Sequence, residues 1–202
     1  LNLNHAQAAQ YATIKLGGHG YTTGASVLKA GVNTSISKLE HNNTAALITG
    51  EGTTLTITGN SSSYGGSFGG TVTVDYTGGG TFTLGNSNKG TALTPASSPD
   101  ATLKISSGTL SLFSGNVTWS QKLVMGDGTT LNVQDGPSVA GYAGYNATSV
   151  NSGGFNFSGA TTFGSGVNLT SSWGKNVKFS GVLTAASGFS ISGGANEYTY
   201  YN

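Results

Sequence analysis

Carboxylates are the side chains of this sequence that could do chemistry, and their spacing decides what chemistry to expect. Glycan-cleaving enzymes place two carboxyl groups about 5–10 Å apart, and calcium sites gather several oxygen ligands around one ion. The acids here are scattered along the chain, and no two occupy the same position of successive repeats in the 19-residue pattern described below. We therefore expect turn roles for Asp127 and Asp135 rather than catalysis.

The remaining reactive residue types are also poorly placed for a reaction. The chain has three histidines, His5, His19 and His41, at spacings that zinc sites do not use, and it has no cysteine. The string Gly65-Gly66-Ser67-Phe68-Gly69 matches a hydrolase nucleophile motif, but it lies in a glycine-rich turn region without the strand–turn–helix context that the motif needs. The sequence predicts a protein that is not an enzyme and needs no metal or cofactor; a degenerate polysaccharide-active enzyme is a minor alternative.

Composition excludes further classes of function. Charged residues make up 7% of the 202 residues and the net charge is +1, so no basic patch predicts nucleic-acid binding. No apolar run approaches the ~20 residues of a transmembrane helix. With 36% hydrophobic residues, 34 glycines and only 3 prolines, the chain is expected to fold. Because it begins at Leu1 without a signal-like stretch, we interpret it as a processed protein or a fragment.

A repeat organises the sequence. Gly50-Glu51-Gly52-Thr53-Thr54-Leu55-Thr56-Ile57 is closely similar to Gly126-Asp127-Gly128-Thr129-Thr130-Leu131-Asn132-Val133, and the offset between them divides into four equal steps of 19. One column at this step is aliphatic in eight successive positions, whereas the preceding column is mostly small and polar. This alternation is typical of strands with one face buried. The aliphatic column is Ile36, Leu55, Val74, Leu93, Leu112, Leu131, Val150 and Leu169.

A 19-residue unit is too short to bury its own core, so successive units must stack. We therefore predict an all-β chain forming a single parallel β-solenoid with 19-residue coils over 32–194, with an irregular excursion near 136–154. Residues 1–31 are predicted to be an N-terminal cap or joint, and the composition of His5 to Ala12 favours a short helix there. Residues 195–202 form a tyrosine-rich tail.

The stretches 50–57, 107–112 and 126–133 resemble the β-helical passengers of bacterial type V secretion, which include autotransporters and filamentous-haemagglutinin-like exoproteins. The resemblance covers about residues 32–194 and rests on architecture, because no binding motif matches. It implies a right-handed parallel β-helix that is extracellular, at a bacterial cell surface, and serves as a structural or adhesive stalk or filament without catalytic activity.

Several partners remain open at this point. Other copies of the chain could stack on its ends, through the N-terminal segment and Tyr198, Tyr200 and Tyr201. A glycan or a receptor protein could instead bind exposed aromatic rings; the candidates are Tyr142, Tyr145, Trp119 and Trp173, and the alternative is that these rings pack in the interior. A third candidate is an ice-binding ladder starting at Thr54 and Thr56, which Asp75 and Phe113 would interrupt.

Overall fold

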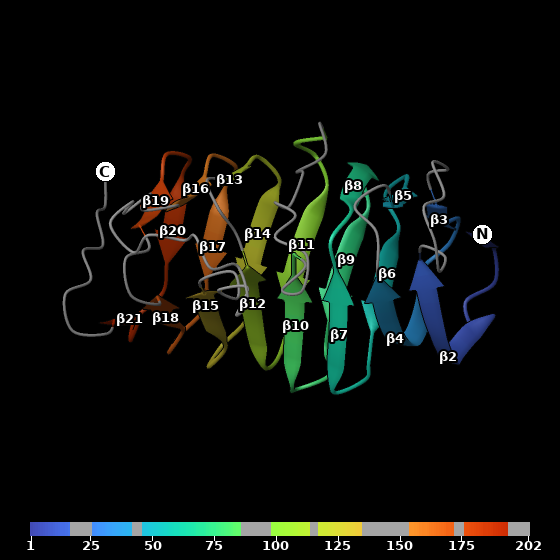
Figure 1. The fold of residues 1–202 in the computed structure, drawn as a ribbon, viewed down its shortest axis with the longest axis horizontal. Helices are drawn as coiled ribbons and strands as arrows, with labels where there is room; N and C mark the ends of the chain where they lie inside the picture. The colour runs from blue at the N-terminus through green and yellow to red at the C-terminus, as the bar shows by residue number, and fades with distance from the viewer. Residues whose placement is uncertain are drawn as a thin grey trace, which may run out of the picture.

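The computed structural model describes residues 1–16, 26–41, 46–85, 98–113, 117–134, 154–171 and 176–193, and the structural statements below refer to these ranges. All strand pairings in them are parallel, and the strands stack along the longest axis of the molecule from β2 at one end to β21 at the other (Figure 1). No helix in these ranges is long and apolar enough to cross a bilayer. The chain is an all-β solenoid of parallel strands, as the repeat predicted.

The described strands form three faces, and from β6 onward the chain visits them in the order face 1, face 2, face 3 wherever a strand of each is described. Face 1 is the eight-stranded sheet of β2 (Ala9–Leu16), β4 (Thr34–His41), β6 (Thr54–Ile57), β9 (Thr73–Tyr76), β11 (Thr102–Ile105), β14 (Lys122–Met125), β17 (Thr161–Phe163) and β20 (Leu183–Ala185). Face 2 is the six-stranded sheet of β7 (Ser61–Tyr64), β10 (Thr81–Leu84), β12 (Thr109–Phe113), β15 (Thr130–Gln134), β18 (Asn168–Ser171) and β21 (Ser190–Gly193).

Face 3 consists of two shorter sheets. One contains β1 (Asn2–Leu3), β3 (Ser26–Ala30), β5 (Ala46–Gly50) and β8 (Ser67–Gly70). The other contains β13 (Val117–Trp119), β16 (Gly154–Phe157) and β19 (Asn176–Phe179). The long strands β2 and β4 begin on face 1, and the second half of β4 lies beside β7 at the start of face 2.

The predicted 19-residue period describes only part of the chain. Paired positions of neighbouring coils are separated by 19 residues from Leu55 to Val74 and by 21 from Ile36 to Ile57. The separation rises to 29 residues from Val74 to Leu103 and to 38 from Leu131 to Leu169. Each internal range outside the described residues follows a strand on face 2 or the second half of β2 or β4. The coil therefore varies in length mainly at one corner, and the predicted excursion near 136–154 falls within the longest step.

The predicted aliphatic column is buried but is not one column. Its described members are at most 1% exposed. Ile36, Leu55 and Val74 lie on face 1, whereas Leu112, Leu131 and Leu169 lie on face 2. Leu93 and Val150 lie outside the described residues, and β9 pairs directly with β11 and β15 with β18. Because side chains alternate inward on every face, a step near 19 can move from an inward position on one face to an inward position on another.

The predicted N-terminal helix is wrong. Residues 5–8 form a turn, and Ala9–Leu16 is strand β2, which pairs with β4. The alanines and glutamines there favour a helix by intrinsic propensity, but pairing with the next coil and burial of Ile14 and Leu16 outweigh that preference. The coils therefore begin inside the predicted 1–31 segment, while the predicted tail at 195–202 lies outside the described residues.

Glycine is needed at the corner between faces 1 and 2. Five successive coils place a glycine with positive φ (67° to 85°) there, a conformation that other residues adopt only with strain; these are Gly79, Gly108, Gly128, Gly166 and Gly188. The predicted turn role of Asp127 is confirmed at this corner, because its carboxylate accepts a hydrogen bond of 2.8 Å from the Ser165 backbone N–H of the next coil.

Tyr64 joins two faces across the interior. Its ring lies in the core on face 2, and its hydroxyl is 2.7 Å from the carbonyl oxygen of Ser67 and 3.0 Å from that of Ala46, both on face 3. A Cβ atom on Gly66 would collide with the same Ala46 carbonyl oxygen, so glycine is required beside it. Burial raises the pKa of the Tyr64 phenol, which keeps it protonated as the donor.

A chain of aromatic contacts runs through the core between the two sheets of face 3. Trp119 is 2% exposed, and its ring centroid is 5.8 Å from that of Phe68 on β8 and 6.4 Å from that of Phe155 on β16. The chain continues through Phe157, Phe179, Phe163 and Phe189 with centroid distances of 4.7 to 5.7 Å. Trp119 is therefore a core residue and not a ligand contact, which corrects one of the sequence-based candidates.

Thr161 is one of several buried residues of the described core with a polar atom that has no hydrogen-bond partner. Thr161 is 2% exposed between its register neighbours Leu123 and Leu183, and its hydroxyl makes no hydrogen bond among the described residues. A buried hydroxyl without a partner costs about 1–3 kcal/mol.

We predict that Thr161→Val raises the free energy of unfolding by about 1 kcal/mol, because valine has the same shape and no polar group to desolvate. Urea unfolding followed by circular dichroism measures this change. Thr162→Val, on the exposed side of the same strand, is the matched control and should change stability by less than about 0.5 kcal/mol. A loss of stability in Thr161→Val would show that the hydroxyl is satisfied.

Candidate functional site: the outer surface of face 2

Two columns of outward positions on face 2, with one residue of each column per strand, contain only serine, threonine and asparagine, and we call them the polar ladder. Ser111 among them is 3% exposed, and Gln134 follows them on β15 in register with Phe113 of β12. The strand pairings align Ser61, Thr81, Thr109, Thr130, Asn168 and Ser190 in the first column, and Ser63, Thr83, Ser111, Asn132, Thr170 and Ser192 in the second. Parallel strands are about 4.8 Å apart and alternate side chains about 6.6 Å apart, so the hydroxyl and amide groups form a regular grid.

Hydrogen bonds along the stack hold part of this grid in place. The Thr170 hydroxyl donates to Asn132 Oδ1 at 3.0 Å, and the Ser190 hydroxyl donates to Asn168 Oδ1 at 3.0 Å. Such bonds fix the side-chain rotamers before a ligand arrives, which lowers the entropy cost of binding. The polar ladder is therefore partly preorganised.

Face 1 differs, although it also carries threonines. Its outward positions include Asp75 and Lys104, whose charged atoms are 3.0 Å apart, and also Lys122, Val124 and Val182. The Asp75 carboxylate also accepts a 2.7 Å hydrogen bond from the Ser106 hydroxyl. The ladder predicted to start at Thr54 and Thr56 is thus interrupted by charge as expected, but Phe113 and Ser111 belong to face 2 and not to that ladder.

Charged residues lie at the N-terminal end of face 2. Glu40 is paired with two lysines, at 2.8 Å from Lys38 and 3.1 Å from Lys15. Together with Ser61, Ser63 and the next strand, Lys38 and Glu40 border a shallow depression of about 290 Å³. Hydrogen bonding to Lys38, and next to Lys15, lowers the pKa of the Glu40 carboxyl below its usual 4.5. This end of the ladder therefore carries a net positive charge.

We predict that Lys38→Gln raises the pKa of Glu40 more than Lys15→Gln does, because Lys38 is its stronger partner. An NMR titration of the Glu40 side-chain carboxyl in both variants measures this. A group with a lowered pKa stabilises the fold above its unfolded-state pKa, and that contribution is lost as the pH falls through the lowered value. The opposite order of the two variants would contradict the pairing.

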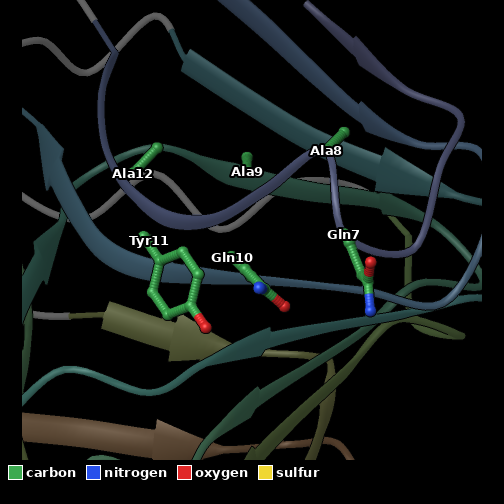
Figure 2. A pocket seen from close by; sticks show the side chains of 6 residues that line it. All are labelled: Gln7, Ala8, Ala9, Gln10, Tyr11 and Ala12. Carbon is green, nitrogen blue, oxygen red and sulfur yellow. The ribbon is translucent and has the colours of Figure 1, made fainter.

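A hollow at the end of face 1 was not predicted. It measures about 450 Å³ and is lined by six consecutive residues, Gln7 to Ala12, where the chain enters β2 (Figure 2). Tyr11 is 88% exposed there. Sequence reasoning missed Tyr11 because it assigned residues 5–12 to a helix; treated as a strand, the segment would have drawn attention to an outward aromatic residue.

The other predicted contacts do not gather into a site. The following predicted residues lie outside the described ranges: Asp135, Tyr142, Tyr145, Trp173, Tyr198, Tyr200 and Tyr201. Ser67 of the hydrolase-like string lies on strand β8, paired with Leu47 of β5, and not on a strand–turn–helix elbow. Among the described residues, no group of three His, Cys, Asp or Glu side chains is placed to hold a metal ion.

These features define the class of the protein as a parallel β-solenoid with two aligned columns of uncharged polar residues along β7 to β21. Neither a protein-family model, nor a curated protein, nor a solved structure matches the chain. Function must therefore be argued from the surface itself.

Proposed function

We propose that this chain is an extracellular structural and adhesive module, and that the polar ladder of face 2 is its adhesive surface for a polysaccharide. The observation that carries the proposal is the uniformity of the ladder. Twelve aligned outward positions on six strands are Ser, Thr or Asn. Hydroxyl and carboxamide groups both donate and accept hydrogen bonds, so they match the hydroxyl groups of a glycan chain without requiring charge.

The architecture suits adhesion better than catalysis. Among the described acids, Asp75 pairs with Lys104, and Asp127 accepts a hydrogen bond at the corner between faces 1 and 2. The other described acids either make similar structural contacts or are exposed. The resemblance to type V secretion passengers supports the same proposal, since it implies a non-catalytic protein at a bacterial surface. The ladder extends over six strands, so many weak contacts could add along one polymer.

The double substitution Thr109→Val and Thr130→Val tests the ladder. These two residues are register partners on face 2. We predict that the variant binds an insoluble polysaccharide about tenfold more weakly than the wild type, because two hydrogen-bonding hydroxyls are lost. Depletion assays on cellulose and chitin, with a glycan array for soluble ligands, measure this.

Thr73→Val with Thr102→Val is the matched control, because these threonines are register partners on face 1. It should bind within twofold of the wild type. Equal binding by the two double variants, or no binding of the wild type to any glycan tested, would refute the adhesive role of face 2.

Ice binding is a second candidate, because the aligned ladder of face 2 contains neither a charged nor an aromatic side chain from Ser61 to Ser192. The charge on face 1 that argued against it does not apply to face 2, but Phe113, the other expected interruption, lies on β12 of face 2 beyond the two columns. The same variants separate the two functions. Thermal hysteresis that disappears in Thr109→Val/Thr130→Val, without glycan binding, would favour ice; no hysteresis in the wild type would exclude it.

The structure gives less support to assembly into a filament than to adhesion. Within the described residues β2 is the edge strand of face 1 at the N-terminal end, and its pairing with β4 shifts register between Ala9 and Thr13. Bulges and lysines on an edge strand, such as Lys15, discourage pairing with another chain. We therefore expect sedimentation at increasing concentration to show monomers, and filaments would show that the ends do join.

A further inference from the structure

We infer that the hollow at Gln7–Ala12 is a binding site for a neutral pyranose ring with an apolar C–H face, such as a β-linked hexose unit, with Tyr11 as the stacking platform. The inference rests on the proposed function, because it names the sugar chemistry that this end of the adhesive surface would recognise. It is carried by the exposure of Tyr11, the bulge that presents it and the rigidity of the turn beside it.

Tyr11 is exposed because of a bulge. Ala9 pairs with Ile36 and Thr13 pairs with Lys38, so β2 has three residues where β4 has only Ser37. The extra residues lie outside the hydrogen-bonded pairing of β2 with β4, and they turn the Tyr11 ring away from the core. Aromatic rings usually bury most of their surface, yet this one is 88% exposed. A free aromatic face on an ordered strand is available to stack on another apolar surface.

The side chains around Tyr11 suit a sugar. Figure 2 shows the side chains of Gln7, Gln10 and Tyr11 extending to the same side of the chain, away from the short side chains of Ala8, Ala9 and Ala12. Each carboxamide offers donors and an acceptor, which match adjacent hydroxyl groups, while the Tyr11 ring matches the C–H face of a pyranose. No charged residue lines the hollow, which is why the inference commits to a neutral sugar.

The hollow is held in shape by hydrogen bonds to the next coil. The Thr34 hydroxyl, in a side chain that is 5% exposed, lies 3.3 Å from the carbonyl oxygen of His5 and 3.1 Å from that of Ala6. Within the turn, the Ala8 N–H donates to the His5 carbonyl oxygen at 3.1 Å, and the Gln7 N–H donates to His5 Nδ1 at 3.3 Å. A preformed turn reduces the ordering cost of binding.

The position of the hollow relates it to the polar ladder. In later coils the corner between faces 1 and 2 carries Gly79, Gly108, Gly128, Gly166 or Gly188. The β2 bulge lies at the equivalent corner, because Ala9 pairs on face 1 and β4 continues toward β7. A sugar stacked on Tyr11 would therefore lie at the margin of the adhesive surface, next to its charged end at Lys15.

The test is a titration of the intact chain with soluble β-1,4-linked gluco- and chito-oligosaccharides, followed by calorimetry and by NMR of residues 7–12. We expect Tyr11→Ala to weaken binding about tenfold and Tyr11→Phe to bind within twofold of the wild type, because the phenyl ring still stacks. Val27→Ala removes another exposed apolar side chain, on β3, and should leave the affinity unchanged.

Two outcomes would overturn the inference. One is Tyr11→Ala binding as tightly as the wild type, and the other is oligosaccharide binding that shifts no resonance of residues 7–12. If Thr109→Val/Thr130→Val still loses binding to the polysaccharide in these cases, the adhesive role of face 2 stands and only the Tyr11 site fails. Absence of any glycan binding by the wild type would overturn both.

Discussion

Parallel backbone hydrogen bonding between successive coils is the constraint on which this structure depends. Each coil must return to the same register after visiting its faces, because a slip by one residue would turn every inward side chain outward. The corner glycines, the Tyr64 hydroxyl across the core and the aromatic contacts around Trp119 all serve that return. The polar ladder follows from the same constraint, since side chains align only when the backbones beneath them do.

The second consequence of this constraint is where the chain can vary. The corners between faces 1 and 2 and between faces 3 and 1 are short in every described coil. The two longest steps, from Val74 to Leu103 and from Leu131 to Leu169, gain their length after face 2. A longer connection there leaves the pairing of β12 with β15 and of β15 with β18 intact. The outer grid of face 2 is therefore continuous across an insertion that the sequence shows as a broken repeat.

The sequence was sufficient for the fold class and for much of the core. Alternation of aliphatic and small polar residues correctly predicted inward positions such as Leu55 and Leu131, because burial of one strand face leaves a local signature. It could not assign Leu112 and Val74 to different faces, since inward positions of neighbouring faces look alike. Nor could it locate the polar ladder of face 2, because the partners Thr81, Thr109 and Thr130 are separated by unequal steps.

The misassigned N-terminus shows a different limit. Alanine and glutamine between His5 and Ala12 carry a helical preference, and only the neighbouring strand β4, far along the chain, overrides it. The prediction of Trp119 as a ligand contact was wrong for a related reason. The sequence does not indicate whether an amphipathic ring is buried or exposed to solvent. Both errors concern residues whose environment is decided by the adjoining coil.

Because the coil varies in length mainly at the corner after face 2, the length of the connections and the spacing of the paired strands can change separately, whereas in most globular domains they are coupled. New chain added after a face 2 strand need not disturb the pairing of the flanking strands, because loop closure becomes only slowly more costly with length. Segments of different size and chemistry could therefore be exchanged at this corner while the strands of face 2 keep their register. If face 2 binds a polysaccharide as proposed, a change at this corner would leave the surface that attaches to the polysaccharide unaltered.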